Sequence, residues 1–74
     1  MKINKAVIYY YELCGITEYK LATVSGIDRS ALNRMLKRDD WEPNVYTLKR
    51  LARAVSVNVS DIVKKAEELS NEQK

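Results

Sequence analysis

Most of the positive charge of this chain lies in one short segment. Residues 29–38 contain four basic side chains and no acidic one, a balance of +4. The whole chain carries a formal net charge of only +3, so all other residues together sum to −1. Clustered Lys and Arg side chains neutralise phosphate groups, so this segment favours an anionic partner. The four residues are Arg29, Arg34, Lys37 and Arg38.

The residue types that most often serve in catalysis, disulfides and zinc sites are scarce. The chain has no histidine and one cysteine, Cys14, which excludes histidine-based triads, disulfides within the chain and the common zinc sites. We interpret Cys14 as a small, partly buried packing residue. We therefore expect no enzyme activity, no metal and no other cofactor.

Length and composition narrow the class of protein further. Seventy-four residues, 46% hydrophobic and 31% charged, are typical of one folded domain with a modest core. No apolar run approaches the ~18 residues of a membrane-spanning helix, and no signal-peptide pattern opens the chain. We expect a cytoplasmic protein with no membrane association.

The basic segment belongs to the second of two short helices, which the sequence predicts over residues 18–25 and 29–37. Gly26 suits the positive φ with which many helices end, and Ala22 is small where the second helix must pass close by. The apolar side chains at this crossing, all expected to face inward, are Leu21, Ala22, Val24, Ile27, Leu32 and Met35.

Suitable capping residues precede the predicted helices. Thr17, Asp28 and Asn44 carry side-chain oxygens that can accept from the first helical turn of the second, third and fourth helices. Asn58 or Ser60 caps the fifth helix. These boundaries predict five helices.

Helical spacing of apolar residues covers most of the chain. A first helix over residues 4–14 carries an inward stripe, and Gly15 ends it. The expected fold is all-α, with five short helices in one compact domain over residues 1–69 and a polar tail over residues 70–74 that frays. The stripe consists of Val7, Tyr10, Tyr11 and Cys14.

The ordered set of these features resembles a known family. The run from Gly15 to Ile62 is similar to the Cro and phage-repressor type of helix-turn-helix domain, often called XRE-like. The likeness covers about two thirds of the chain and implies a five-helix lambda-repressor-like DNA-binding fold. The residues that carry it are G-I-T from Gly15, L-A at Leu21, G-I at Gly26, Pro43, T-L-K-R-L-A-R-A-V from Thr47, and V-N-V-S-D-I from Val57.

The resemblance implies how DNA would be bound. The third helix would lie in the major groove, where arginine can hold guanine and asparagine can hold adenine. The implied base-reading residues are Arg29, Ser30, Asn33 and Arg34, and the alternative is that they form an ordinary solvated helix face. The implied phosphate contacts are Thr17, Tyr19, Lys20, Lys37 and Arg38.

The resemblance also implies a function. Proteins of this type usually bind as dimers to half-sites roughly 34 Å apart on double-stranded DNA. We therefore expect a homodimeric transcriptional repressor of phage or mobile-element type that occupies an operator.

Three acidic residues depart from the family pattern. Glu18 stands where relatives often carry a neutral glutamine, and we assign it to the dipole of its helix rather than to DNA. Asp39 and Asp40 would repel a DNA backbone that came close. They favour an alternative function, a protein-interaction module on the same fold, such as an antirepressor, an accessory subunit or an antitoxin.

Aromatic and apolar residues outside the expected core are candidates for a subunit or regulatory-partner interface. For Trp41, the alternative is that it covers the domain's own core beside Pro43. The candidate interface residues are Tyr9, Trp41, Tyr46, Val59, Ile62, Val63, Ala66 and Leu69.

Overall fold

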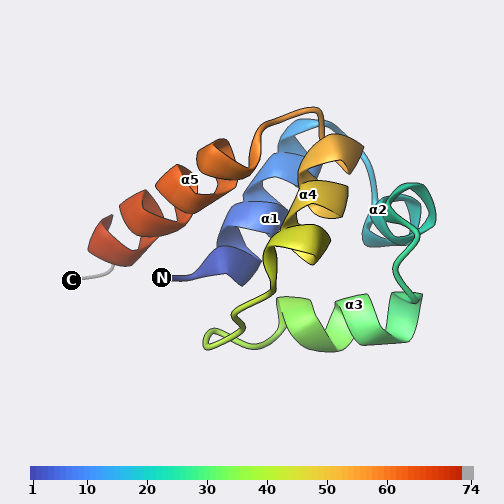
Figure 1. Ribbon diagram of the computed structural model, residues 1–74, viewed down its shortest axis with the longest axis horizontal. Helices are drawn as coiled ribbons and strands as arrows, with labels where there is room; N and C mark the ends of the chain where they lie inside the picture. Colours follow the sequence, from blue (N-terminus) through green and yellow to red (C-terminus); the bar gives the residue numbers. More distant parts are fainter. Residues whose placement is uncertain (73–74) are drawn as a thin grey trace.

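The computed structural model describes residues 1–72, which form five α-helices joined by short connections (Figure 1). No strand occurs within this described part of the chain, so the all-α prediction is confirmed. The helices are α1 (Ile3–Leu13), α2 (Glu18–Ser25), α3 (Arg29–Leu36), α4 (Val45–Ala54) and α5 (Val59–Glu72).

One core joins all five helices. Each helix contributes one of the largest fully buried side chains, so no helix stands apart from the others. Burial of apolar side chains is the main favourable contribution to folding in a domain of this size. The five side chains are those of Val7, Leu21, Leu32, Leu51 and Ile62.

The buried side of α2 differs from the predicted one at a single position. Leu21, Ala22 and Ser25 are buried, whereas the Val24 side chain is 52% exposed. The prediction that Val24 faces inward is therefore wrong. A stripe at spacings of one and three residues is narrow on a helix of eight residues, and Val24 lies at its edge.

The predicted stripe on α1 is buried only in part. Val7 is fully buried and Tyr10 and Tyr11 are half-buried, but Cys14 is exposed. Cys14 follows the last turn of α1, where the chain has left the core, although its thiol donates to the carbonyl oxygen of Val55 at 3.4 Å. The expectation that Cys14 is partly buried is therefore wrong.

Three predicted caps are confirmed. The side chains of Thr17, Asp28 and Asn44 accept from the backbone N–H three residues later, at 3.1, 3.1 and 2.8 Å. At α5 the bond runs in the other direction, because the Asp61 carboxylate accepts from the backbone N–H of Asn58 at 2.9 Å. Each of these bonds satisfies a backbone donor that the helix itself leaves free.

Gly26 makes the turn between α2 and α3. Its φ is 75°, in the left-handed region, and its N–H donates to the carbonyl oxygen of Ala22 at 2.9 Å. The N–H of Ile27 donates to the same oxygen at 3.2 Å. The chain therefore turns at once and α3 begins three residues after Gly26.

The C-terminal helix is longer than predicted. The frayed tail is expected over residues 70–74, but α5 continues through Glu72. The last two residues of that tail lie outside the described residues. None of the described helices is long and apolar enough to cross a membrane.

Candidate nucleic-acid interface

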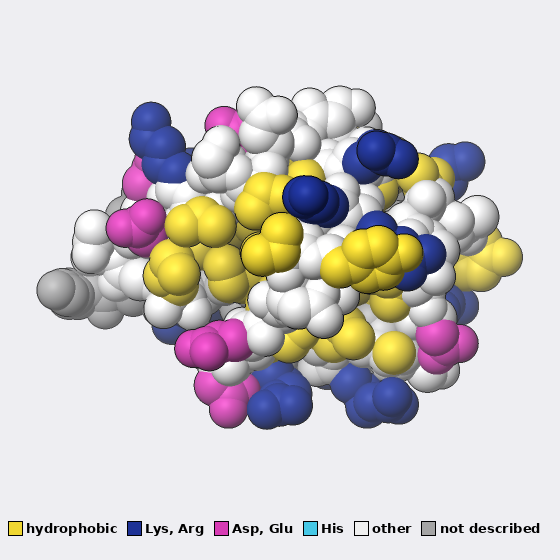
Figure 2. All heavy atoms as spheres, in the orientation of Figure 1, with side chains coloured by type: hydrophobic (Ala, Val, Ile, Leu, Met, Phe, Trp, Pro, Cys, Tyr) yellow, Lys and Arg dark blue, Asp and Glu magenta, His cyan; other side chains and the backbone are white. Residues whose placement is uncertain are grey.

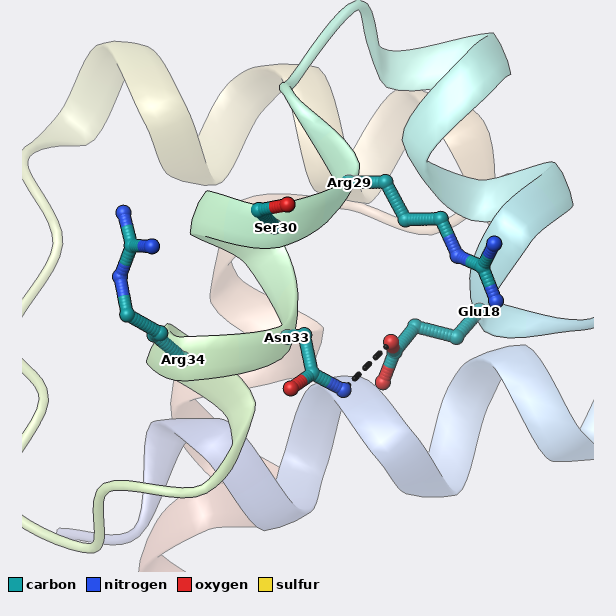
Figure 3. A pocket seen from close by; sticks show the side chains of 5 residues that line it. All are labelled: Glu18, Arg29, Ser30, Asn33 and Arg34. Carbon is teal, nitrogen blue, oxygen red and sulfur yellow. Dashed lines mark hydrogen bonds between the residues drawn. The ribbon is translucent and has the colours of Figure 1, made fainter.

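The four predicted base-reading residues lie together on the outer face of α3 (Figure 3). They line one open hollow, to which α2 contributes Glu18. Leu32 and Leu36, on the opposite side of the same helix, are buried in the core. The core therefore fixes the direction in which the hollow faces. The four residues are Arg29, Ser30, Asn33 and Arg34.

Glu18 has a partner that sequence reasoning missed. The Asn33 side-chain amide donates to the Glu18 carboxylate at 2.9 Å (Figure 3). Glu18 does lie in the first turn of α2, as its assignment to the helix dipole requires. It also reaches α3, and no spacing within α2 signals this contact, because it depends on how the two helices cross.

Arg29 of α3 contacts Tyr19, which follows Glu18 in α2. Its guanidinium lies 5.2 Å from the centre of the Tyr19 ring, which is a cation–π distance. The Tyr19 side chain is 60% exposed, so this pair lies at the surface. The first turn of α2 thus contacts two of the four predicted base-reading residues.

The other predicted phosphate contacts flank this face. Thr17 and Lys20 lie at the start of α2, where the Thr17 oxygen accepts the capping bond and its hydroxyl hydrogen is left to donate. Lys37 follows α3 and is exposed. The Arg38 Nε lies 3.3 Å from the Asp40 carboxylate, an exposed pair worth about 0–1 kcal/mol, which an approaching phosphate can replace.

Asp39 also has partners within the domain. The buried Asn4 side chain donates to its carboxylate at 3.0 Å and to the carbonyl oxygen of Leu36 at 3.1 Å. The Lys2 ammonium lies 3.9 Å from the other carboxylate oxygen. The hydrogen bond from Asn4, which is the largest cause, and the positive charge of Lys2 lower the pKa of Asp39. The contacts tie the end of α3 to α1, and the sequence did not predict them.

Half of the predicted protein-interface residues are unavailable or covered. Ile62 and Ala66 are fully buried, because that side of α5 packs in the domain core. Trp41 is only 8% exposed and belongs to the same core, so the alternative considered for it, that it covers the domain's own core, is confirmed. The Tyr9 ring is 39% exposed but lies 4.2 Å from the Lys65 ammonium, which partly covers it. These three buried residues cannot form a subunit interface.

The remaining interface candidates are accessible to different degrees. Tyr46 is 68% exposed on α4, whereas Val59, Val63 and Leu69 are half-buried. An interface built from this set would therefore depend mainly on Tyr46, on the side of the molecule where α4 lies.

A second basic surface lies on α4. Lys49, Arg50 and Arg53 line a hollow with Tyr46, and none of the described carboxylates pairs with these cations. The Arg50 guanidinium lies 5.3 Å from the centre of the Tyr46 ring and donates to the carbonyl oxygen of Gly26 at 3.5 Å. Figure 2 shows Lys and Arg side chains both over α4 and along the lower edge, where α3 lies in Figure 1. Positive charge therefore gathers in two places, over α4 and along α3.

Comparison with known proteins gives no relative: no family model, no curated protein and no solved structure matches the chain. Among the described residues, no group of three or more Cys, Asp or Glu side chains has the geometry to hold a metal ion. The function must therefore be inferred from the geometry and charge of the two basic surfaces.

Proposed function

We propose that this protein is a sequence-specific DNA-binding regulator of the helix-turn-helix type, with the lambda-repressor-like arrangement of its five helices. The observation that carries the proposal is the outer face of α3, on which two arginines, a serine and an asparagine line one open hollow. A helix of this width fits the major groove of B-form DNA, and these side chains have the donors and acceptors needed there.

Each side chain of the hollow has a natural partner on a base edge. Arg29 and Arg34 can each hold guanine through N7 and O6, and Asn33 can hold adenine through N6 and N7. Ser30, at the start of the helix, can donate or accept. The buried Leu32 fixes the register of the helix, so all four groups approach the groove from one side.

Phosphate contacts would flank the reading helix. The N-terminal turn of α2, with Thr17 and Lys20, lies on one side, and Lys37 and Arg38 lie on the other. Backbone N–H groups and the positive end of the helix dipole favour an anion at the start of α2. These contacts would set affinity and its salt dependence, whereas the α3 side chains would set sequence preference.

Regulation would follow from occupancy alone. A homodimer on a two-fold operator would block transcription as a repressor, with no cofactor and no catalytic step. Two copies would also compensate for the modest net charge of +3 on each chain.

Selection of bound sequences from a random double-stranded DNA pool tests the proposal. We expect the wild-type protein to enrich a two-fold symmetric site, and binding to that site to weaken steeply as salt is raised. Arg29→Ala and Asn33→Ala should each relax preference at one position of the half-site by about tenfold. Lys64→Ala, which removes an exposed charge on α5, is the control. Unchanged affinity and base preference in both reading-helix variants would refute this role for α3.

One observation favours the alternative function, a protein-interaction module. The hollow on α4 combines three cations that form no ion pair with a described carboxylate, together with Tyr46 and the half-exposed Val24. Apolar side chains beside charges are more typical of protein partners than of phosphate contacts. The acidic residues give less support, because Asp39 and Asp40 have partners within the domain. Failure to bind any DNA at low salt would favour this alternative.

A further inference from the structure

The Glu18 carboxylate lies within the reading face rather than outside it. It lines the same hollow as the α3 side chains and accepts from Asn33 at 2.9 Å. No described cation forms an ion pair with Glu18, and the neighbouring Arg29 lies over the Tyr19 ring instead. A carboxylate without an ion-pair partner therefore stands among the groups that would meet the bases.

This contact fixes the orientation of the Asn33 amide. A carboxylate can only accept, so the amide nitrogen must face Glu18 and the amide oxygen must face away. Figure 3 shows this arrangement, with the Asn33 oxygen on the side opposite Glu18. Asn33 keeps one free N–H and its oxygen, which are the two groups that a bidentate contact with adenine needs.

The hollow is consequently rich in hydrogen-bond acceptors near Asn33. The amide oxygen and the second carboxylate oxygen of Glu18 both accept, and a base that faces them must donate. Adenine and cytosine carry amino groups in the major groove, at N6 and N4, whereas guanine presents only the acceptors O6 and N7 there. A carboxylate brought against guanine would lose its water without gaining a partner.

We propose that Glu18 is a specificity-determining residue, which selects an amino-bearing base, adenine or cytosine, opposite Asn33 and rejects guanine. This inference rests on the proposed DNA-reading function and adds a role for α2 to it. Glu18 thus lowers the affinity of the protein for most DNA sequences and increases its discrimination between bases at one position.

The alternative is that the bond only holds α2 against α3. Glu18→Gln separates the two roles, because glutamine is nearly the same size and its oxygen can accept the same bond from Asn33. The substitution removes the charge and adds a donor that guanine O6 or N7 can accept. A purely structural role predicts unchanged base preference, and the specificity role predicts that guanine becomes acceptable.

The experiment is selection from a random double-stranded DNA pool with the full chain, in parallel for wild type, Glu18→Gln, Asn33→Ala and Glu67→Gln. Glu67 is exposed on α5, so its substitution makes the same change in net charge away from the hollow. Thermal unfolding followed by circular dichroism establishes that each variant is folded.

We expect wild type to prefer adenine or cytosine over guanine by about tenfold at one position of the half-site, and Glu18→Gln to reduce that ratio to about twofold there and nowhere else. Glu67→Gln should keep the wild-type pattern. If Glu18→Gln keeps it too while Asn33→Ala does not, the role of Glu18 is refuted and DNA reading stands. If wild type enriches no sequence, the proposed function and this inference both fail.

Discussion

At the residue scale, the turn between α2 and α3 depends on the missing side chain of Gly26. A Cβ added there would come 2.5 Å from the Arg50 Nη2. The φ of 75° also lies in the left-handed region, which is unfavourable for residues that have a Cβ. Gly15 has nearly the same φ, 74°, but apart from its own chain neighbours no atom lies within 4 Å of the position of its missing Cβ. A substitution at Gly15 therefore introduces backbone strain alone, whereas a substitution at Gly26 introduces the same strain and a collision with the Arg50 side chain.

We expect Gly15→Ala to lower the free energy of unfolding by about 1–2 kcal/mol, the cost of a left-handed backbone for alanine. Gly26→Ala should lower it by more, because Arg50 must also give up its contact with the Gly26 carbonyl oxygen. Urea denaturation measures both values. In an Arg50→Ala background the excess cost at Gly26 should disappear, and a persistent excess would mean that Arg50 is not its cause.

Lys37 should contribute to DNA affinity without contributing to sequence choice. It is exposed directly after α3, and none of the described carboxylates forms an ion pair with it. Lys37→Ala should reduce the slope of log affinity against log salt by about one and weaken binding to all sequences alike. Fluorescence anisotropy at several salt concentrations measures the slope, with Lys64→Ala as the control. A change in base preference in Lys37→Ala would contradict its assignment to phosphate.

At the scale of elements, the junction between α1 and α3 depends on one buried polar side chain. Asn4 is 2% exposed and donates both to the end of α3 and to Asp39 in the following loop. A buried donor with two partners is costly to remove, because each acceptor then loses its partner. This junction holds the C-terminal end of α3, the helix that we propose reads DNA.

The same junction makes stability depend on pH. Because the Asn4 hydrogen bond and nearby lysines hold the pKa of Asp39 below its ordinary value of 3.8, the folded protein binds the Asp39 proton less tightly than the unfolded chain. The stabilisation that the Asp39 carboxylate provides is complete above pH 3.8, and it is lost as the pH falls through the lower pKa of the folded state. We expect the melting temperature of Asp39→Asn to fall less than that of wild type between about pH 5 and pH 2. Asp40→Asn, the control for loss of one negative charge, should follow wild type; equal acid sensitivity in all three proteins would contradict the coupling.

Local and non-local features of the fold differed in how well the sequence predicted them. Thr17 and Asp28 cap helices through bonds that span three residues, so a local pattern was enough. The bonds of Asn4 to Leu36 and of Asn33 to Glu18 span 32 and 15 residues. Their formation depends on how the helices cross, which local spacing does not specify. The sequence therefore predicted the group of α3 side chains that line one hollow but not the contact of Glu18 with them.

At the scale of the whole molecule, size limits how two copies can share DNA. The domain measures 34 × 23 × 22 Å, and half-sites one helical turn apart are separated by roughly 34–36 Å. Two copies on neighbouring major grooves of one face are therefore large enough to touch. The most exposed of the remaining interface candidates, Tyr46, is available for such a contact, since it is not part of the core.

Spacing between half-sites should consequently control affinity. Five additional base pairs turn one half-site to the opposite face of the duplex. Ten additional base pairs restore the face but separate the half-sites by roughly 68 Å, about twice the longest dimension of the domain, 34 Å. We expect tight binding only at the natural spacing and, at the other two, the affinity of a single half-site. Gel-shift titration of the three duplexes measures this difference, with a duplex carrying one half-site as the reference. Two copies of this size can touch only when the half-sites lie on the same face of the duplex and at the shorter distance. Equal affinity at all three spacings would therefore mean that the two copies bind independently.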